Sequence, residues 1–117
     1  MAAEVRSAID VVTEALRRLN LIAGDAEAAG FEADNTLARW HELASDLADE
    51  EIIEFPAGEV PIEAFRSCVN LLADTIAPSY GRQPLADPDN DLHPSRVRLR
   101  RRLANREDGD VMTISEF

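Results

Sequence analysis

Residues able to do chemistry are few and scattered in this 117-residue chain. The two histidines are His41, which follows a tryptophan, and His93, which precedes Pro94. The sequence contains no H-x-x-x-H pair, no C-x-x-C pair and no glycine-rich phosphate loop, so metal and nucleotide sites lack their usual ligands. Cys68 and a histidine could in principle form a nucleophile, but nothing local supports such a pair. We therefore expect no catalysis, no metal and no cofactor.

Cys68 is the only cysteine, so no internal disulfide can form, which fits a reducing compartment. Its helical position between Ser67 and Val69 predicts a small core hydrophobe. No apolar stretch approaches the roughly 18 residues of a membrane-spanning helix, and the first ten residues lack an apolar signal core. We expect synthesis in the cytoplasm.

Charge is unevenly distributed along the chain. All 12 basic residues are arginine, against 23 acids, for a net charge of −11. Residues 1–90 hold 18 acids and 6 arginines, whereas the segment from Pro94 to Arg106 holds the other 6 arginines and no acid. The protein as a whole should repel nucleic acid at long range, while one local surface could attract it.

A chain of this length fits one domain. Three segments carry apolar residues at steps of three and four, which place them on one face of a helix. Asn20 and Gly24 are plausible stops for the first helix, Pro61 suits the first position of the third, and Pro78 forces its end. The stripes are Val5, Ile9, Val12, Leu16 and Leu19; Ala33, Leu37, Trp40, Leu43, Ala44 and Leu47; and Ile62, Phe65, Val69, Leu72 and Ile76.

The remaining segments predict connectors and an extension. Residues 52–61 have two prolines and a glycine and should be an extended connector, too short for a sheet of its own. Residues 82–94, with three prolines, predict a linker or an ordered arm outside the core. We therefore expect an all-α fold: a three-helix core in residues 1–81, then, in 82–117, this linker, a short Arg-rich helix and an extended C-terminal tail.

The Arg-rich helix should start at Pro94. Its apolar stripe is thin, with Leu99 and Leu103 four residues apart, so the three-helix core should hold it weakly unless something outside packs against it. An acidic, glycine-containing hinge and a β-prone run follow. That run is either a frayed end or a strand that adds to the sheet edge of a partner. Its candidate binding residues are Val111, Met112, Thr113, Ile114 and Phe117.

Two charged clusters are candidate interaction sites. One is acidic, at the end of the second helix, and is either a solvated face or half of an interface with an Arg-rich surface of the same chain or a neighbouring copy. The other is the arginine run, which either pairs with acids of another subunit, lies near DNA phosphates or is solvated. A metal is disfavoured because the spacing of a calcium loop is missing, and sequence-specific DNA readout because no helix-turn-helix pattern is present. The clusters are Asp46, Asp49, Glu50 and Glu51, and Arg98, Arg100, Arg101 and Arg102.

The order of these elements resembles a known family. The phrases AIDVVTEALRRLNLIAGD, NTLARWHELASDLADEEI and VPIEAFRSCVNLLADTIAPSYG are similar to the helical core of tailed-phage head–tail adaptors, also called head-completion, connector or packaged-DNA stabilisation proteins. The first phrase has Asn20 in place of the glycine that usually ends the family's ALRRLG-like phrase. Leu37 and Trp40 match its L-x-x-W phrase, and residues 76–81 its LAPxYG-like phrase. Residues 82–117 match no family phrase.

The resemblance implies a virion assembly protein made in the host cytoplasm and located at the head–tail interface. Such adaptors form a dodecameric ring under the portal, extend the DNA channel, help to retain packaged DNA and dock a tail or stopper protein. DNA passes without sequence-specific contact, no membrane takes part, and C-terminal segments commonly engage the portal. The alternative function is that of a small regulatory or antitoxin-like protein that binds nucleic acid through its Arg-rich helix.

Overall fold

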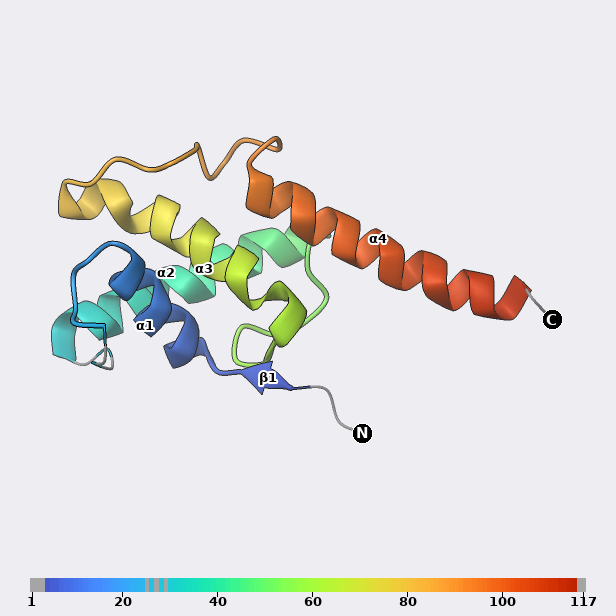
Figure 1. Ribbon diagram of the computed structural model, residues 1–117, viewed down its shortest axis with the longest axis horizontal. Coiled ribbons are helices and arrows are strands. Elements are labelled where there is room, and N and C mark those ends of the chain that lie inside the picture. Colours follow the sequence, from blue (N-terminus) through green and yellow to red (C-terminus); the bar gives the residue numbers. More distant parts are fainter. Residues whose placement is uncertain (1–3, 25, 27, 29, 116–117) are drawn as a thin grey trace.

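The computed structural model describes residues 4–24, 26, 28 and 30–115, without the side chains of residues 31 and 107–115. It is mainly helical and contains one short sheet (Figure 1). The elements are β1 (Val5–Arg6), α1 (Ala8–Arg18), α2 (Gly30–Asp49), β2 (Val60–Pro61), α3 (Ile62–Ile76), the 3-10 helix η1 (Ala77–Tyr80) and α4 (Pro94–Ser115).

Helix α1 begins at a capping box. The Ser7 hydroxyl accepts a hydrogen bond from the Asp10 N–H at 3.2 Å, and the Asp10 carboxylate accepts one from the Ser7 N–H at 3.1 Å. Because this cap starts the helix at Ala8, Val5 lies in β1 instead of the predicted helical stripe, and it is exposed. The predicted stop at Asn20 is confirmed, since Asn20 follows the helix in the left-handed region with φ 59°.

Strands β1 and β2 pair antiparallel, with Val5 opposite Pro61 and Arg6 opposite Val60. Residues 52–61 form no sheet of their own, as expected, but their last two residues pair with β1 from the start of the chain, which we did not predict. Pro61 precedes the first residue of α3 instead of occupying it. The predicted end near Pro78 is confirmed, because α3 changes to η1 after Ile76 and closes at Gly81, where φ is 70°.

The core lies between α1, α2 and α3, and it contains most of the predicted stripes. Trp40 of α2 is fully buried, and its indole N–H donates to the carbonyl of Ala57 at 2.9 Å. This bond fastens the 52–61 connector over the core. Cys68 is also fully buried, which confirms the core role predicted for it, whereas Ile62 at the start of α3 is exposed.

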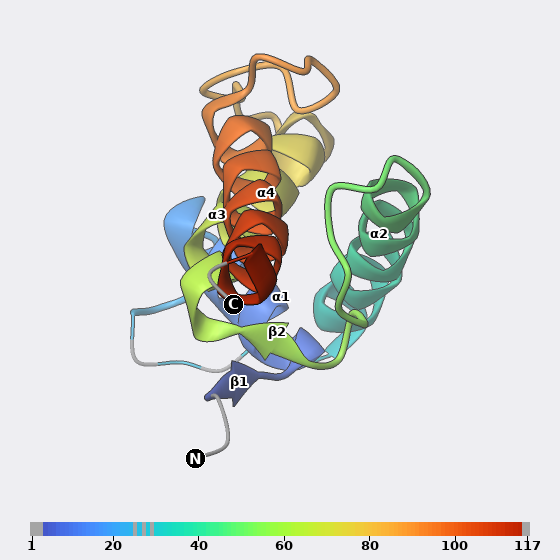
Figure 2. The ribbon, with the colours of Figure 1, turned by 90° about the vertical axis from the view of Figure 1, so that its right-hand side faces the viewer.

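Helix α4 differs most from prediction. It spans 22 residues, packs on α3 over its first turns and then extends past the rest of the molecule (Figures 1 and 2). The predictions of a short helix and an extended tail are wrong, since α4 runs to Ser115 and residues 111–115 are helical. The thin apolar stripe is used more fully than we expected, because Leu99 is 1% exposed and belongs to the core cluster. Once the packing of Leu99 fixes the first turns, each further residue adds a backbone hydrogen bond at little cost.

No helix in the described part of the chain is long and apolar enough to cross a membrane.

Candidate partner-binding site

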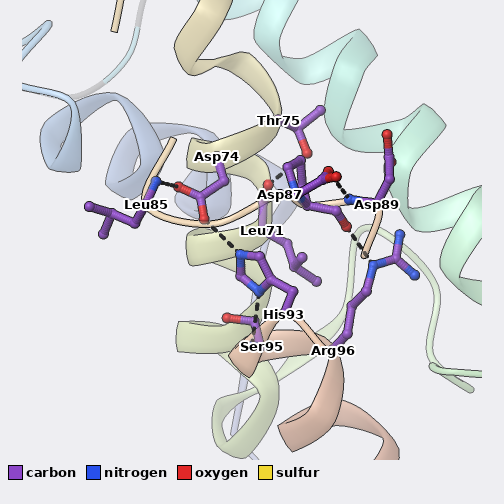
Figure 3. A network of polar contacts seen from close by, with 10 residues as sticks. Leu71, Asp74, Thr75, Leu85, Asp87, Asp89, His93, Ser95 and Arg96 are labelled. Atoms are coloured by element: carbon purple, nitrogen blue, oxygen red, sulfur yellow. Dashed lines mark hydrogen bonds and ion pairs between the residues drawn. The ribbon is translucent and has the colours of Figure 1, made fainter. Parts of the chain in front are cut away.

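The base of α4 is a cap made by His93 (Figure 3). The Nδ1 atom of His93 accepts a hydrogen bond from the N–H of Ser95 at 3.0 Å, and the His93 carbonyl accepts from the N–H of Val97 at 3.0 Å. Pro94, at the first helical position, has no N–H to satisfy. His93 therefore does for α4 what Ser7 does for α1.

Asp74 of α3 holds this cap in place. Its Oδ2 lies 2.7 Å from Nε2 of His93, and its Oδ1 accepts from the N–H of Leu85 at 3.1 Å. Since Nδ1 of the imidazole is an acceptor, Nε2 carries the proton and donates to the carboxylate. Both groups are buried, at 7% and 4% exposed. The Asp74 carboxylate thus links α3, the 81–93 loop and α4. Both nitrogens of the His93 imidazole are used in these hydrogen bonds, so neither has a free lone pair to accept a proton from a substrate.

Arg96 extends the junction to α2. Its side chain is 4% exposed, and Nη1 lies 3.0 Å from Oε2 of Glu50 while Nε donates to the carbonyl of Pro88 at 2.5 Å. A guanidinium this buried needs such partners to offset its lost hydration. The pair joins the base of α4 to the end of α2 and to the loop.

Arg102 secures the next turns of α4. Its Nη1 lies 2.7 Å from Oε1 of Glu54, its Nη2 lies 3.2 Å from Oε1 of Glu63, and its guanidinium carbon stands 5.3 Å from the centroid of the Phe55 ring. The pKa of the Glu63 carboxyl is lowered, first by a hydrogen bond from its own backbone N–H and further by Arg102, while partial burial opposes the shift. Polar and aromatic contacts thus supplement the thin apolar stripe.

The structure divides the predicted charged residues into two groups. Glu50 pairs with Arg96, and Arg100 pairs with Asp91 at 2.9 Å, so these charges and those of Arg102 are used within the chain. The rest are exposed and make no ion pair with another described residue. They are Asp46, Asp49 and Glu51 of the acidic cluster, and Arg98 and Arg101 of the arginine run.

Two charged surfaces flank the 83–89 loop. The acidic groove, about 600 Å³, lies between α2, the end of α3, η1 and this loop, and its charged rim includes Glu42, Asp46, Asp87 and Asp89. The arginine face (Arg18, Arg66 and Arg98) lines two smaller grooves, of about 310 and 150 Å³, that share Arg18.

The candidate portal-binding residues Val111, Met112, Thr113 and Ile114 fall in the last turns of α4, and Phe117 lies outside the described residues. Strand addition does not fit this segment, because its backbone hydrogen bonds are used within the helix. Among the charged residues predicted as interaction sites, Arg102 is the one that contacts the 52–61 connector, through Glu54 and Phe55.

Sequence reasoning missed Asp74, His93 and Arg96 as the residues that hold α4. Pro94 did signal the start of α4, since proline is typical of the first helical position, but histidine is not a usual capping residue and His93 gave no sign of its role. Asp74 carried none, because its partners lie 11 and 19 residues along the chain.

No protein-family model, curated protein or solved structure matches the chain. The likeness to head–tail adaptors therefore rests on the sequence phrases of residues 8–81 alone.

Proposed function

We propose that the chain is a structural head-to-tail adaptor of a tailed phage or phage-like particle. In this proposal it forms a ring under the portal, extends the DNA channel, helps to retain packaged DNA and docks the tail. The observation that carries the proposal is the form of α4, which is fixed at its base and projects at its end (Figure 1).

A projecting helix of this kind suits docking to a partner. The His93 cap, the buried Leu99 and the pairs of Arg96 and Arg102 set the direction of α4 before any partner arrives. Less conformational freedom is then lost on binding, which favours affinity. We assign portal contact to the last turns of α4, from Val111 to Ser115, together with Phe117, which lies outside the described residues.

The charge of the body supports the same proposal. A net charge of −11 disfavours binding of DNA phosphates to the channel wall, which lets DNA slide through the channel. We also propose that the protein is not an enzyme, since its buried His93–Asp74 pair is occupied as a helix cap.

Deletion of residues 111–117 tests the portal contact. We expect the truncated protein to keep its helical circular dichroism and melting temperature, because the described core contacts lie upstream, and to lose binding to the portal protein of the same genome in a pull-down. Leu85→Ser, at an exposed loop position, is the control and should bind normally. A truncated protein that binds as well as the intact chain would refute the assignment.

A second candidate is a regulatory protein that binds nucleic acid, favoured by the exposed Arg98 and Arg101. The DNA affinity of the isolated chain should then fall as salt rises. The slope of log affinity against log salt concentration should become shallower by roughly 0.9 for each phosphate contact that Arg98→Ala or Arg101→Ala removes. Absence of such binding at low salt would remove this candidate.

A further inference from the structure

After the ion pairs within the chain are formed, charges of both signs remain on different faces. Arg18, Arg66 and Arg98 make no ion pair with a described carboxylate. They come from α1, α3 and α4, and the larger of their two grooves also contains Phe65, Val69 and the ion pair of Glu14 with Arg17. The arginine face therefore combines three guanidinium groups with apolar surface.

The acidic groove has the complementary composition. Its rim carries Glu42, Asp46, Asp87 and Asp89, and its walls include apolar side chains such as Leu43 and Pro78. Arg39 is the cation on this rim and lies 3.9 Å from Glu42, which leaves the other three carboxylates without an ion pair to a described residue. The groove is thus suited to guanidinium groups.

The acidic groove and the smaller groove of the arginine face meet at Asp74 and Ala86 but are otherwise lined by different helices. Helix α2 lines the acidic groove and neither groove of the arginine face, whereas α1 and α4 line only the latter. Figure 2 shows α2 set apart from the α3–α4 pair. One molecule cannot bring its own two surfaces together, but two copies can.

We propose that the arginine face of one copy binds the acidic groove of a second copy, head to tail. Guanidinium groups pair with carboxylates through two parallel hydrogen bonds, which fixes orientation as well as affinity. Nucleic acid suits the arginine face less, because its phosphates would meet a chain of net charge −11. A heterologous contact repeats until it closes a ring or continues as a filament. The inference rests on the proposed function and supplies its subunit contact.

The charges also predict an unusual salt dependence. Two copies of net charge −11 repel each other at long range, and salt near 0.15 M screens that repulsion beyond about 8 Å while pairs in contact persist. Self-association should therefore be weak at very low salt, strongest near physiological salt and lost again in molar salt. An apolar interface would instead persist or strengthen in molar salt.

Reciprocal charge reversal tests the proposal in the full-length chain. One variant reverses the arginine face (Arg66→Glu with Arg98→Glu), and the other reverses the acidic groove (Asp46→Arg with Asp89→Arg). We expect each alone to self-associate at least tenfold more weakly than the parent in sedimentation velocity, and an equimolar mixture to assemble again, because each variant offers the surface that the other needs. Arg106→Glu, at an exposed position of α4 outside these grooves, is the control and should assemble as the parent does.

Two outcomes would overturn the proposal: parent-like assembly of either reversed variant, or a parent that stays monomeric near physiological salt at high concentration. Circular dichroism checks that each variant is folded. If a double variant does not fold, the single reversals Arg98→Glu and Asp46→Arg are used in the same mixing test. Portal binding is measured separately. If the reversed variants lose self-association but the parent does not bind the portal protein, the subunit contact is supported and the adaptor function is refuted. If the reversed variants assemble like the parent while the parent binds the portal protein, the subunit contact alone is refuted.

Discussion

The Asp74 carboxylate accepts hydrogen bonds from a loop amide and from the imidazole that caps α4. Loss of either partner leaves buried polar groups unsatisfied. We expect His93→Ala and Asp74→Ala each to lower the free energy of unfolding by about 1–3 kcal/mol in urea titrations. Because the two side chains act through one contact, the double variant should lose less than the sum of the two.

Exposed His41 provides the control for this cycle, and His41→Ala should unfold like the parent. Strictly additive losses at positions 74 and 93 would contradict the shared role of the pair.

Cys68 is fully buried, and burial raises the pKa of its thiol to about 12. The reactive thiolate is therefore scarce and inaccessible in the folded protein. We expect no alkylation by iodoacetamide at mildly alkaline pH in native buffer, and complete alkylation in denaturant, by intact-protein mass spectrometry. Rapid labelling of the native protein would show that α3 opens far more readily than its packing implies.

At the scale of elements, the docking of α4 depends on Leu99. Its side chain is 1% exposed, whereas Leu103 one turn later is only partly buried. Leu99→Ala should lower the free energy of unfolding by about 2–5 kcal/mol, and Leu103→Ala by clearly less. If both variants lost the same small amount of unfolding free energy in urea titrations, α4 would not be packed into the core.

The contact between α4 and the start of α3 should respond to acid. The pKa of Glu63 is lowered from 4.5, so its carboxylate stabilises the folded state above pH 4.5, and this contribution is lost as the pH falls through the lower native value. Arg102→Gln should therefore cost stability at neutral pH, and the difference from the parent should shrink in acid. The effect should be small, since Glu63 is about half exposed and screened by water. If the difference in unfolding free energy between Arg102→Gln and the parent grew below pH 4.5, the role assigned to the Arg102–Glu63 pair would be wrong.

The sequence predicts elements best where the signal is local. The stripes of α1, α2 and α3 repeat at helical spacing, and Asn20 and Pro78 mark real ends. The β1–β2 pairing was not predictable in this way, because Val5 and Pro61 are 56 positions apart and neither carries a strand pattern. Residues 111–115 were misassigned because β-propensity is weaker than the continuity of a helix already started upstream.

At the scale of the whole molecule, the sequence located the charges but not their partners. Arg96 and Arg98 are equivalent in sequence terms, yet one is buried against Glu50 and the other is exposed. The difference follows from Leu99, since its insertion sets the rotation of α4 on α3 and hence which arginines face the body. Such a rotation is fixed by tertiary packing and leaves no local pattern.

The chain has a single tryptophan, and its indole is buried and hydrogen-bonded to the connector carbonyl of Ala57. That placement makes Trp40 a built-in optical reporter: its fluorescence should shift to longer wavelength when the connector lifts or the core melts. Because Trp40 lies in the body, a change at the far end of α4 should leave the emission spectrum untouched. Unlabelled protein can thus report whether an assembly variant has damaged the body or only its contacts.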